Sequence, residues 1–139
     1  MSAAPFRAAC VSLCSGREPT TNIEAASDHV RDAARDGAGF VCTPENTLLM
    51  EAGGKHLFAA VTYEDDTLAV RDLAALAGDL GIWLSVGSLA IKVSEDKVAN
   101  RSFLMGPDGR IHARYDKIHM FDVSLPNGES YLESKNYQP

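Results

Sequence analysis

The sequence lacks three features that would assign it to whole classes of protein. No apolar run approaches the ~20 residues that a membrane-spanning helix needs, and the segment from Met1 to Cys14 has no long apolar core like that of a signal peptide. Lys and Arg total 13 against 19 Asp and Glu, so the net charge is −6, without the basic excess that phosphate binding requires. We therefore expect a cytoplasmic protein that binds neither a membrane nor nucleic acid.

Cysteine is also scarce, with three residues (Cys10, Cys14 and Cys42) and none after Cys42. An odd count without an export signal favours reduced thiols. Cys10 and Cys14 are four residues apart in one predicted strand, so we expect both on one face of the core. His29 and His56 offer no ligand spacing beside them, and Cys42 is most simply a buried, inert thiol. We predict no metal site and no cofactor.

The residues that are present predict one globular domain that alternates strands and helices. Apolar residues are 45% of the chain and charged residues 23%, which is typical of a globular protein. An apolar run from Phe6 to Ser15 predicts a buried strand. Helical spacing from Ile23 to Ala34 predicts a helix that starts with a capping box, Thr21-x-x-Glu24, and ends at Gly37. The run from Ala38 to Thr43 predicts a second strand, parallel to the first.

The second half of the chain predicts further helices and an antiparallel set of strands. A short helix from Leu57 to Val61 precedes a longer amphipathic helix that begins at Asp66 and is closed by Gly81. The predicted strands that follow are Ile82–Lys92, Lys97–Gly106 and Ile111–Tyr115, the last two joined by a turn at Pro107-Asp108-Gly109. Beyond Lys117 the sequence is loop-like. The order β-α-β-α-β-β-β indicates a layered α/β fold.

Two charged residues stand next to predicted strand ends. Glu45 follows the strand that ends at Thr43-Pro44, and open α/β sheets place their chemistry at the carboxyl ends of strands. Lys117 follows the strand that ends at Tyr115. Taken singly, Glu45 fits a solvated loop carboxylate and Lys117 fits a surface charge, so only their combination suggests a site.

The segments around these residues resemble the glutamate and lysine signatures of the nitrilase, or carbon–nitrogen hydrolase, superfamily. The segments are Thr43-Pro44-Glu45-Asn46 and Tyr115-Asp116-Lys117-Ile118-His119-Met120-Phe121-Asp122. Leu125-Pro126-Asn127-Gly128-Glu129 and Tyr131-Leu132-Glu133-Ser134 extend the resemblance, and are most similar to its Nit-type amidase branch. The resemblance covers nearly the whole chain. It implies the family's α-β-β-α sandwich, truncated, with residues 1–139 as the N-terminal part of a single domain.

The resemblance also implies roles for three residues. The family uses a Glu–Lys–Cys triad, in which Glu45 matches the general base and Lys117 the cation near the developing oxyanion. Glu133 matches an additional glutamate that helps to position the substrate and the lysine, and Glu129 is a weaker candidate for the same role. In the family the nucleophilic cysteine follows the lysine segment, and this sequence has no cysteine there.

The function implied is therefore that of an N-terminal fragment of a cysteine-dependent amidase acting on a small-molecule amide, inactive alone and homo-oligomeric at full length. An alternative is a catalytically dead module of the same fold that binds a ligand or a partner chain. A third, weaker possibility is an autonomous enzyme that uses Cys42. Half of a two-sheet sandwich leaves apolar sheet surface uncovered, so we expect the isolated chain to be poorly soluble or to self-associate.

Overall fold

The computed structural model describes residues 5–51 and 53–139, so the first four residues of the Met1–Cys14 segment lie outside the described part. Within it no helix is long and apolar enough to cross a membrane. The helices and strands run in the order β1 (Ala8–Cys10), α1 (Pro19–Arg35), β2 (Phe40–Cys42), α2 (Gly54–Ala60), η1 (Glu64–Asp66), α3 (Leu68–Leu80), β3 (Trp83–Lys92), β4 (Val98–Met105), β5 (Ile111–Asp116), β6 (Asp122–Ser124), β7 (Ser130–Leu132) and η2 (Glu133–Lys135).

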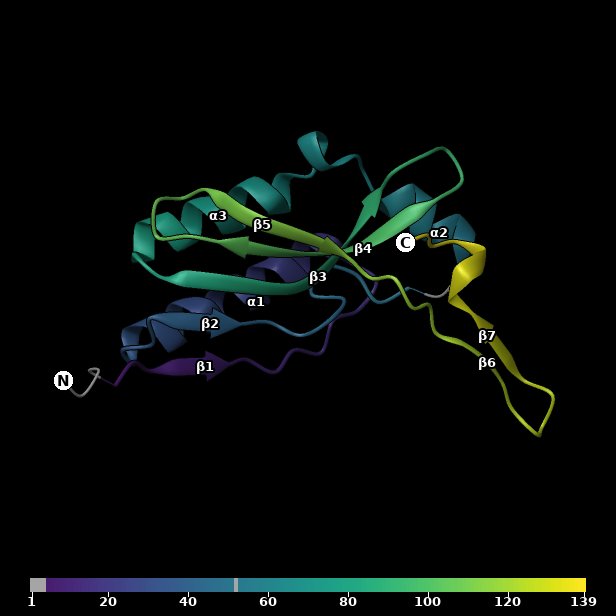
Figure 1. The fold of residues 1–139 in the computed structure, drawn as a ribbon, viewed down its shortest axis with the longest axis horizontal. Coiled ribbons are helices and arrows are strands. Elements are labelled where there is room, and N and C mark those ends of the chain that lie inside the picture. The colour runs from purple at the N-terminus through teal and green to yellow at the C-terminus, as the bar shows by residue number, and fades with distance from the viewer. Residues whose placement is uncertain (1–4, 52) are drawn as a thin grey trace.

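The main sheet contains five strands in the order β1-β2-β3-β4-β5 (Figure 1). β1, β2 and β3 are parallel, and β3, β4 and β5 are antiparallel. The predicted α/β class and the predicted parallel pairing of the first two strands are therefore confirmed. The parallel pairs need crossover connections, which α1 and the segment containing α3 provide.

Apolar side chains of α1 and α3 pack against one face of this sheet. The core between these layers contains the fully buried side chains of Val30, Leu73, Leu84, Val86, Phe103 and Met105. Burying a side chain of this size contributes roughly 1.5–3 kcal/mol relative to exposure. A packed helical layer thus supports the sheet whose strands β2 and β5 precede Glu45 and Lys117.

The helix ends agree with the sequence prediction better than the helix starts. α3 ends where Gly81 adopts the left-handed conformation (φ 64°), and after α1 Gly37 has a φ of 89°. The predicted capping box is wrong: α1 begins at Pro19 after Glu18, and its start has no side-chain cap. Proline fits this position because the first helical turn does not need its missing N–H.

The predicted buried strand from Phe6 to Ser15 is also wrong. Its regular part is only β1, Ala8–Cys10, which forms an edge of the sheet and is largely exposed. Cys10 and Cys14 are exposed rather than packed in the core, and Cys14 lies beyond the strand. Cys42 is half-buried. β1 pairs with β2 alone, so this part of the apolar run is an edge strand and not a central one.

The region after Lys117, which the sequence predicts to be loop-like, contains a β-hairpin. β6 and β7 pair antiparallel, and Gly128 in their connection has a φ of 89°. The hairpin projects away from the main sheet (Figure 1). η2 follows it directly and carries Glu133, so the hairpin returns the chain to the end of the main sheet.

Candidate active site

Glu45 lies in a loop that hydroxyl groups hold against β3. Thr43 accepts a hydrogen bond at Oγ1 from the backbone N–H of Gly87 (3.1 Å), and its hydroxyl is 2.7 Å from that of Thr47. The backbone N–H of Asn46 donates to Ser88 Oγ at 2.9 Å. Thr43, Thr47 and Ser88 are buried, so these contacts fix the backbone on both sides of Glu45.

Gly87 allows this loop to approach the sheet. A Cβ atom at Gly87 would lie 2.4 Å from the backbone of Pro44, far closer than two such atoms can approach. The register of β3 against β4 also shifts between Val86 and Leu89, which is typical of a bulge. The glycine in the predicted strand is therefore the point at which the loop carrying Glu45 meets the sheet.

Lys117 is placed by the end of β5. Its backbone N–H donates to the carbonyl oxygen of Asn100 in β4 at 2.9 Å. The preceding residue, Asp116, accepts two hydrogen bonds from the guanidinium of Arg101, at 2.6 and 2.8 Å, and Arg101 also pairs with Glu64 at 2.7 Å. Such a two-point contact restrains both partners, so the strand end that bears Lys117 is held on two sides.

Glu133 opens η2 and faces the segment between β5 and β6. Its Oε2 accepts a hydrogen bond from the backbone N–H of Phe121 at 2.5 Å, and its own N–H donates to the carbonyl oxygen of Phe121 at 3.2 Å. Its side chain is 16% exposed. The weaker candidate, Glu129, lies in the exposed hairpin turn, where its N–H donates to Asn127.

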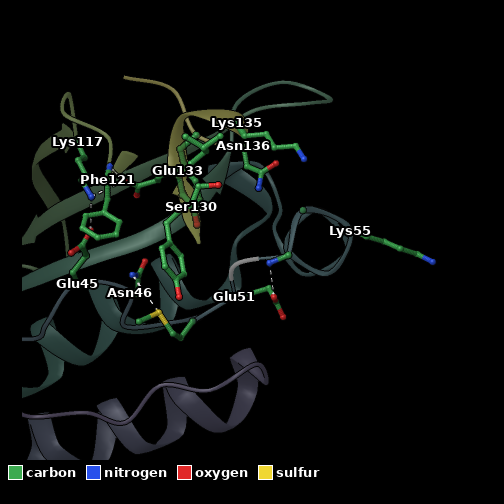
Figure 2. A pocket seen from close by; sticks show the side chains of 16 residues that line it. Glu45, Asn46, Glu51, Lys55, Lys117, Phe121, Ser130, Glu133, Lys135 and Asn136 are labelled. Carbon is green, nitrogen blue, oxygen red and sulfur yellow. Dashed lines mark hydrogen bonds and ion pairs between the residues drawn. The ribbon is translucent and has the colours of Figure 1, made fainter. Parts of the chain in front are cut away.

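The three residues that the resemblance singles out come together at one point (Figure 2). Lys117 Nζ lies 3.1 Å from Glu45 Oε1 and 2.8 Å from Glu133 Oε2. They come from the loop after β2, the end of β5 and the start of η2. The geometry is a single ammonium between two carboxylates, with net charge −1 when all three groups are ionised.

The contacts favour the charged forms of Lys117 and Glu133. Burial alone lowers the pKa of Lys117, but hydrogen bonds to Glu133 and Glu45 and their negative charges raise it above the ordinary value. Burial alone raises the pKa of Glu133, but hydrogen bonds from Lys117 and the Phe121 backbone lower it below the ordinary value. Lys117 is therefore a fixed cation at neutral pH.

Two further residues at this site are not found by sequence reasoning. Asn100, a buried residue of β4, donates from Nδ2 to Glu45 Oε1 at 2.7 Å. Tyr137 has its pKa raised to about 12 by burial and by the nearby charges of Glu133 and Glu45. An amide within the buried run that opens β4 is the available signal for Asn100, whereas nothing in the sequence distinguishes Tyr137.

A cavity of about 910 Å³ opens beside the three charged groups. Its lining includes Glu45, Lys117, Phe121, Glu133 and Tyr137, together with Lys55 and Lys135. Cys10, Cys14 and Cys42 are not among the lining residues. Over residues 5–51 and 53–139, no three His, Cys, Asp or Glu side chains gather as a metal site. The cavity is large enough for a small organic substrate.

The structure thus combines a mixed α/β sheet with a carboxylate–ammonium–carboxylate cluster at the strand ends. The family model for carbon-nitrogen hydrolases matches residues 7–139. The chain belongs to the carbon-nitrogen hydrolase family. Among curated relatives, it is 34% identical over 134 residues to the deaminated glutathione amidase of Yersinia enterocolitica, covering 94% of this chain and 46% of that protein.

A second curated relative and two solved structures are also similar to the chain, the structures in their fold. The chain is 30% identical over 134 residues to the omega-amidase of Homo sapiens, covering 96% of this chain and 48% of that protein. It superimposes on the C. elegans NitFhit protein with a TM-score of 0.80 at 23% identity, over 93% of this chain and 32% of that chain. An amidase from Nesterenkonia sp. gives a TM-score of 0.75 at 22% identity, over 96% and 48%. The chain spans about half the length of the curated relatives it matches.

Proposed function

We propose that residues 1–139 are the N-terminal part of a single carbon–nitrogen hydrolase domain, and that the whole protein is a cysteine-dependent amidase acting on a small carboxamide. The observation that carries the proposal is the convergence of Glu45, Lys117 and Glu133 beside one cavity. The relatives named as amidases support hydrolysis of a carbon–nitrogen bond as the reaction class.

In this proposal Glu45 is the general base and Lys117 the electrostatic catalyst. Glu45 removes the proton of a thiol, whose sulfur then bonds to the amide carbon. The ammonium of Lys117 stabilises the negative charge that develops on the amide oxygen, an effect worth a few kcal/mol for one well-placed donor. The C–N bond then breaks, and ammonia leaves with the proton. Water attacks the resulting thioester, which yields the carboxylic acid and restores the thiol.

Glu133 acts in this scheme as a positioning residue. It contacts Lys117 at 2.8 Å and is itself fixed by the Phe121 backbone. Its lowered pKa keeps it anionic at neutral pH, so it stabilises the charged form of Lys117 throughout the reaction. Glu45, whose side chain is 54% exposed, remains accessible to exchange protons with a substrate or a thiol.

The nucleophile in this proposal comes from sequence beyond residue 139. Neither Cys10, Cys14 nor Cys42 lines the cavity. Burial and the neighbouring Cys10 thiol raise the pKa of Cys42, whereas a nucleophilic cysteine needs a lowered pKa. The 139-residue chain alone is therefore inactive in this scheme, and Cys42 is not the nucleophile.

The test uses the full-length protein encoded by the gene. The coding sequence beyond codon 139 is read first, and the protein is then incubated with acetamide or succinamate and followed by intact-mass measurement. We expect a mass increase that matches an acyl-enzyme, abolished by Lys117→Ala and retained by Lys92→Ala, a lysine whose partner is the exposed Glu95. An unchanged acyl-enzyme in Lys117→Ala rejects the role of Lys117. A coding sequence that stops at codon 139 favours the binding module instead.

A further inference from the structure

Asn100 contacts every charged member of the candidate site. It belongs to β4, and the whole residue is only 3% exposed. Its side-chain amide donates to Glu45 and lies beside Glu133, where it lowers the pKa of that carboxyl, while its backbone carbonyl accepts the backbone N–H of Lys117 at 2.9 Å. Buried amides are kept in proteins where their hydrogen bonds are satisfied, and here the side-chain amide faces the two glutamates of the site.

The contact with Glu45 distinguishes the two oxygens of that carboxylate. Asn100 Nδ2 lies 2.7 Å from Oε1, and Lys117 Nζ lies 3.1 Å from the same atom. Within the part of the chain that the structure describes, no hydrogen bond is recorded to Oε2 of Glu45. Oε1 of Glu45 therefore accepts hydrogen bonds from both Asn100 and Lys117, and Oε2 is available to accept a proton.

A neutral donor is suited to this position for an electrostatic reason. Two carboxylates already surround one ammonium, so a further carboxylate would add like-charge repulsion, and a further cation would compete with Lys117 for its partners. An asparagine amide offers two N–H donors without a charge. It can therefore bind both glutamates while it leaves the charge balance of the site unchanged.

From these contacts we infer that Asn100 is the positioning residue that holds Glu45 and Glu133 around Lys117 and leaves one oxygen of Glu45 available as the base. The role of that oxygen as a base rests on the proposed function. The positioning itself is a property of the chain, and it can be measured without turnover.

The experiment measures the reactivity of Lys117 in the 139-residue chain. The chain and its variants Asn100→Leu and Asn100→Ala are treated with a low concentration of acetic anhydride near pH 8, and acetylation at Lys117 is quantified by peptide mass spectrometry relative to Lys92. Loss of the amide lets Glu45 turn into solvent and loosens Glu133, so Lys117 loses ion-pair partners. We expect the relative acetylation rate to rise at least about threefold, because the pKa of Lys117 falls and more of its amine is unprotonated near pH 8.

The matched control is Asn22→Leu. Asn22 is also a buried amide, 8% exposed, and it hydrogen-bonds Gly16 and Leu48 away from the cavity. A rise in both Asn100 variants and none in Asn22→Leu supports the inference. An unchanged or lower rate in the Asn100 variants, or an equal rise in Asn22→Leu, overturns it. The readout needs no nucleophile, so an inactive full-length protein would reject the proposed function and leave this result standing.

Discussion

Lys117 lies closer to Glu133 than to Glu45, and the closer carboxylate is also the more buried one. The distances from Nζ are 2.8 and 3.1 Å, and the two glutamate side chains are 16% and 54% exposed. Interactions between charges are stronger where water is excluded. The two glutamates are therefore not equivalent: Glu133 is the closer and more shielded partner of Lys117, and Glu45 is the partner that solvent can reach.

This asymmetry predicts unequal effects of two isosteric substitutions on Lys117. Glu133→Gln should lower the pKa of Lys117 by more than Glu45→Gln does, because it removes the closer and less screened charge. The five lysines can be labelled by reductive methylation with ¹³C-formaldehyde and titrated by NMR, with Lys117 assigned from a Lys117→Arg variant. Lys92 serves as the internal control. Equal shifts, or a larger shift in Glu45→Gln, would contradict the assignment.

The lowered pKa of Glu133 also predicts a dependence of stability on pH. A carboxyl group whose pKa is lower in the folded state than its ordinary value of 4.5 stabilises the fold fully above that value. The stabilisation is lost as the pH falls through the lowered pKa. The urea midpoint of the native chain should thus exceed that of Glu133→Gln at pH 7, and the difference should be smaller at pH 3.

Glu95→Gln is the control for this titration, since Glu95 is 87% exposed and contacts Lys92 and the Tyr63 hydroxyl at the surface. Its midpoint should follow that of the native chain at both pH values, because exposed ion pairs contribute little. A constant difference between the native chain and Glu133→Gln at both pH values would show that the pKa of Glu133 is not linked to folding.

Gly87→Ala should disrupt the loop that carries Glu45. The added Cβ would lie 2.4 Å from the Pro44 backbone, so either the loop or β3 must move. We expect a loss of at least about 2 kcal/mol in the free energy of unfolding, as is typical of overpacked sites. Gly39→Ala is the matched control, since a Cβ at Gly39 meets nothing within 4 Å. Similar urea midpoints for the two variants would refute the close contact.

Much of this fold could be predicted from the sequence because its longer elements are regular. The helix closed by Gly81 and the strands before and after Pro107-Asp108-Gly109 have clear periodicity and turn residues. The hairpin β6–β7 cannot be predicted in this way because each of its strands has three residues, too few to show alternation. Phe6 to Ser15 was misjudged because an apolar run does not reveal whether a strand lies at an edge of the sheet.

The site could be predicted only in part, for a related reason. Glu45, Lys117 and Glu133 belong to sequence segments that resemble a family, so their proximity could be expected. Asn100 and Gly87 act through contacts with residues far along the chain. Such contacts depend on strand register, which sets the side of the sheet that each residue faces. An asparagine and a glycine inside strands do not reveal that register.

The open face of the main sheet predicts that the 139-residue chain self-associates. Across the strands, Cys10, Cys42, Ser85, Leu104 and Ala113 form one register row, and each of them is exposed or half-buried. Exposed sheet surface of this kind favours association with another sheet. We expect sedimentation velocity to reveal oligomers whose fraction increases with concentration, and Leu104→Lys to raise the monomer fraction because a charge would have to be buried in the contact.

Leu68→Lys is the control that separates this effect from a general gain in solubility. Leu68 is 60% exposed at the start of α3, a helix that packs on the opposite side of the sheet, so the same change of side chain adds the same charge away from the open face. Its oligomer fraction should match that of the native chain. A native chain that stays monomeric at every concentration, or an equal gain of monomer in Leu68→Lys, would exclude the open face as the surface of association.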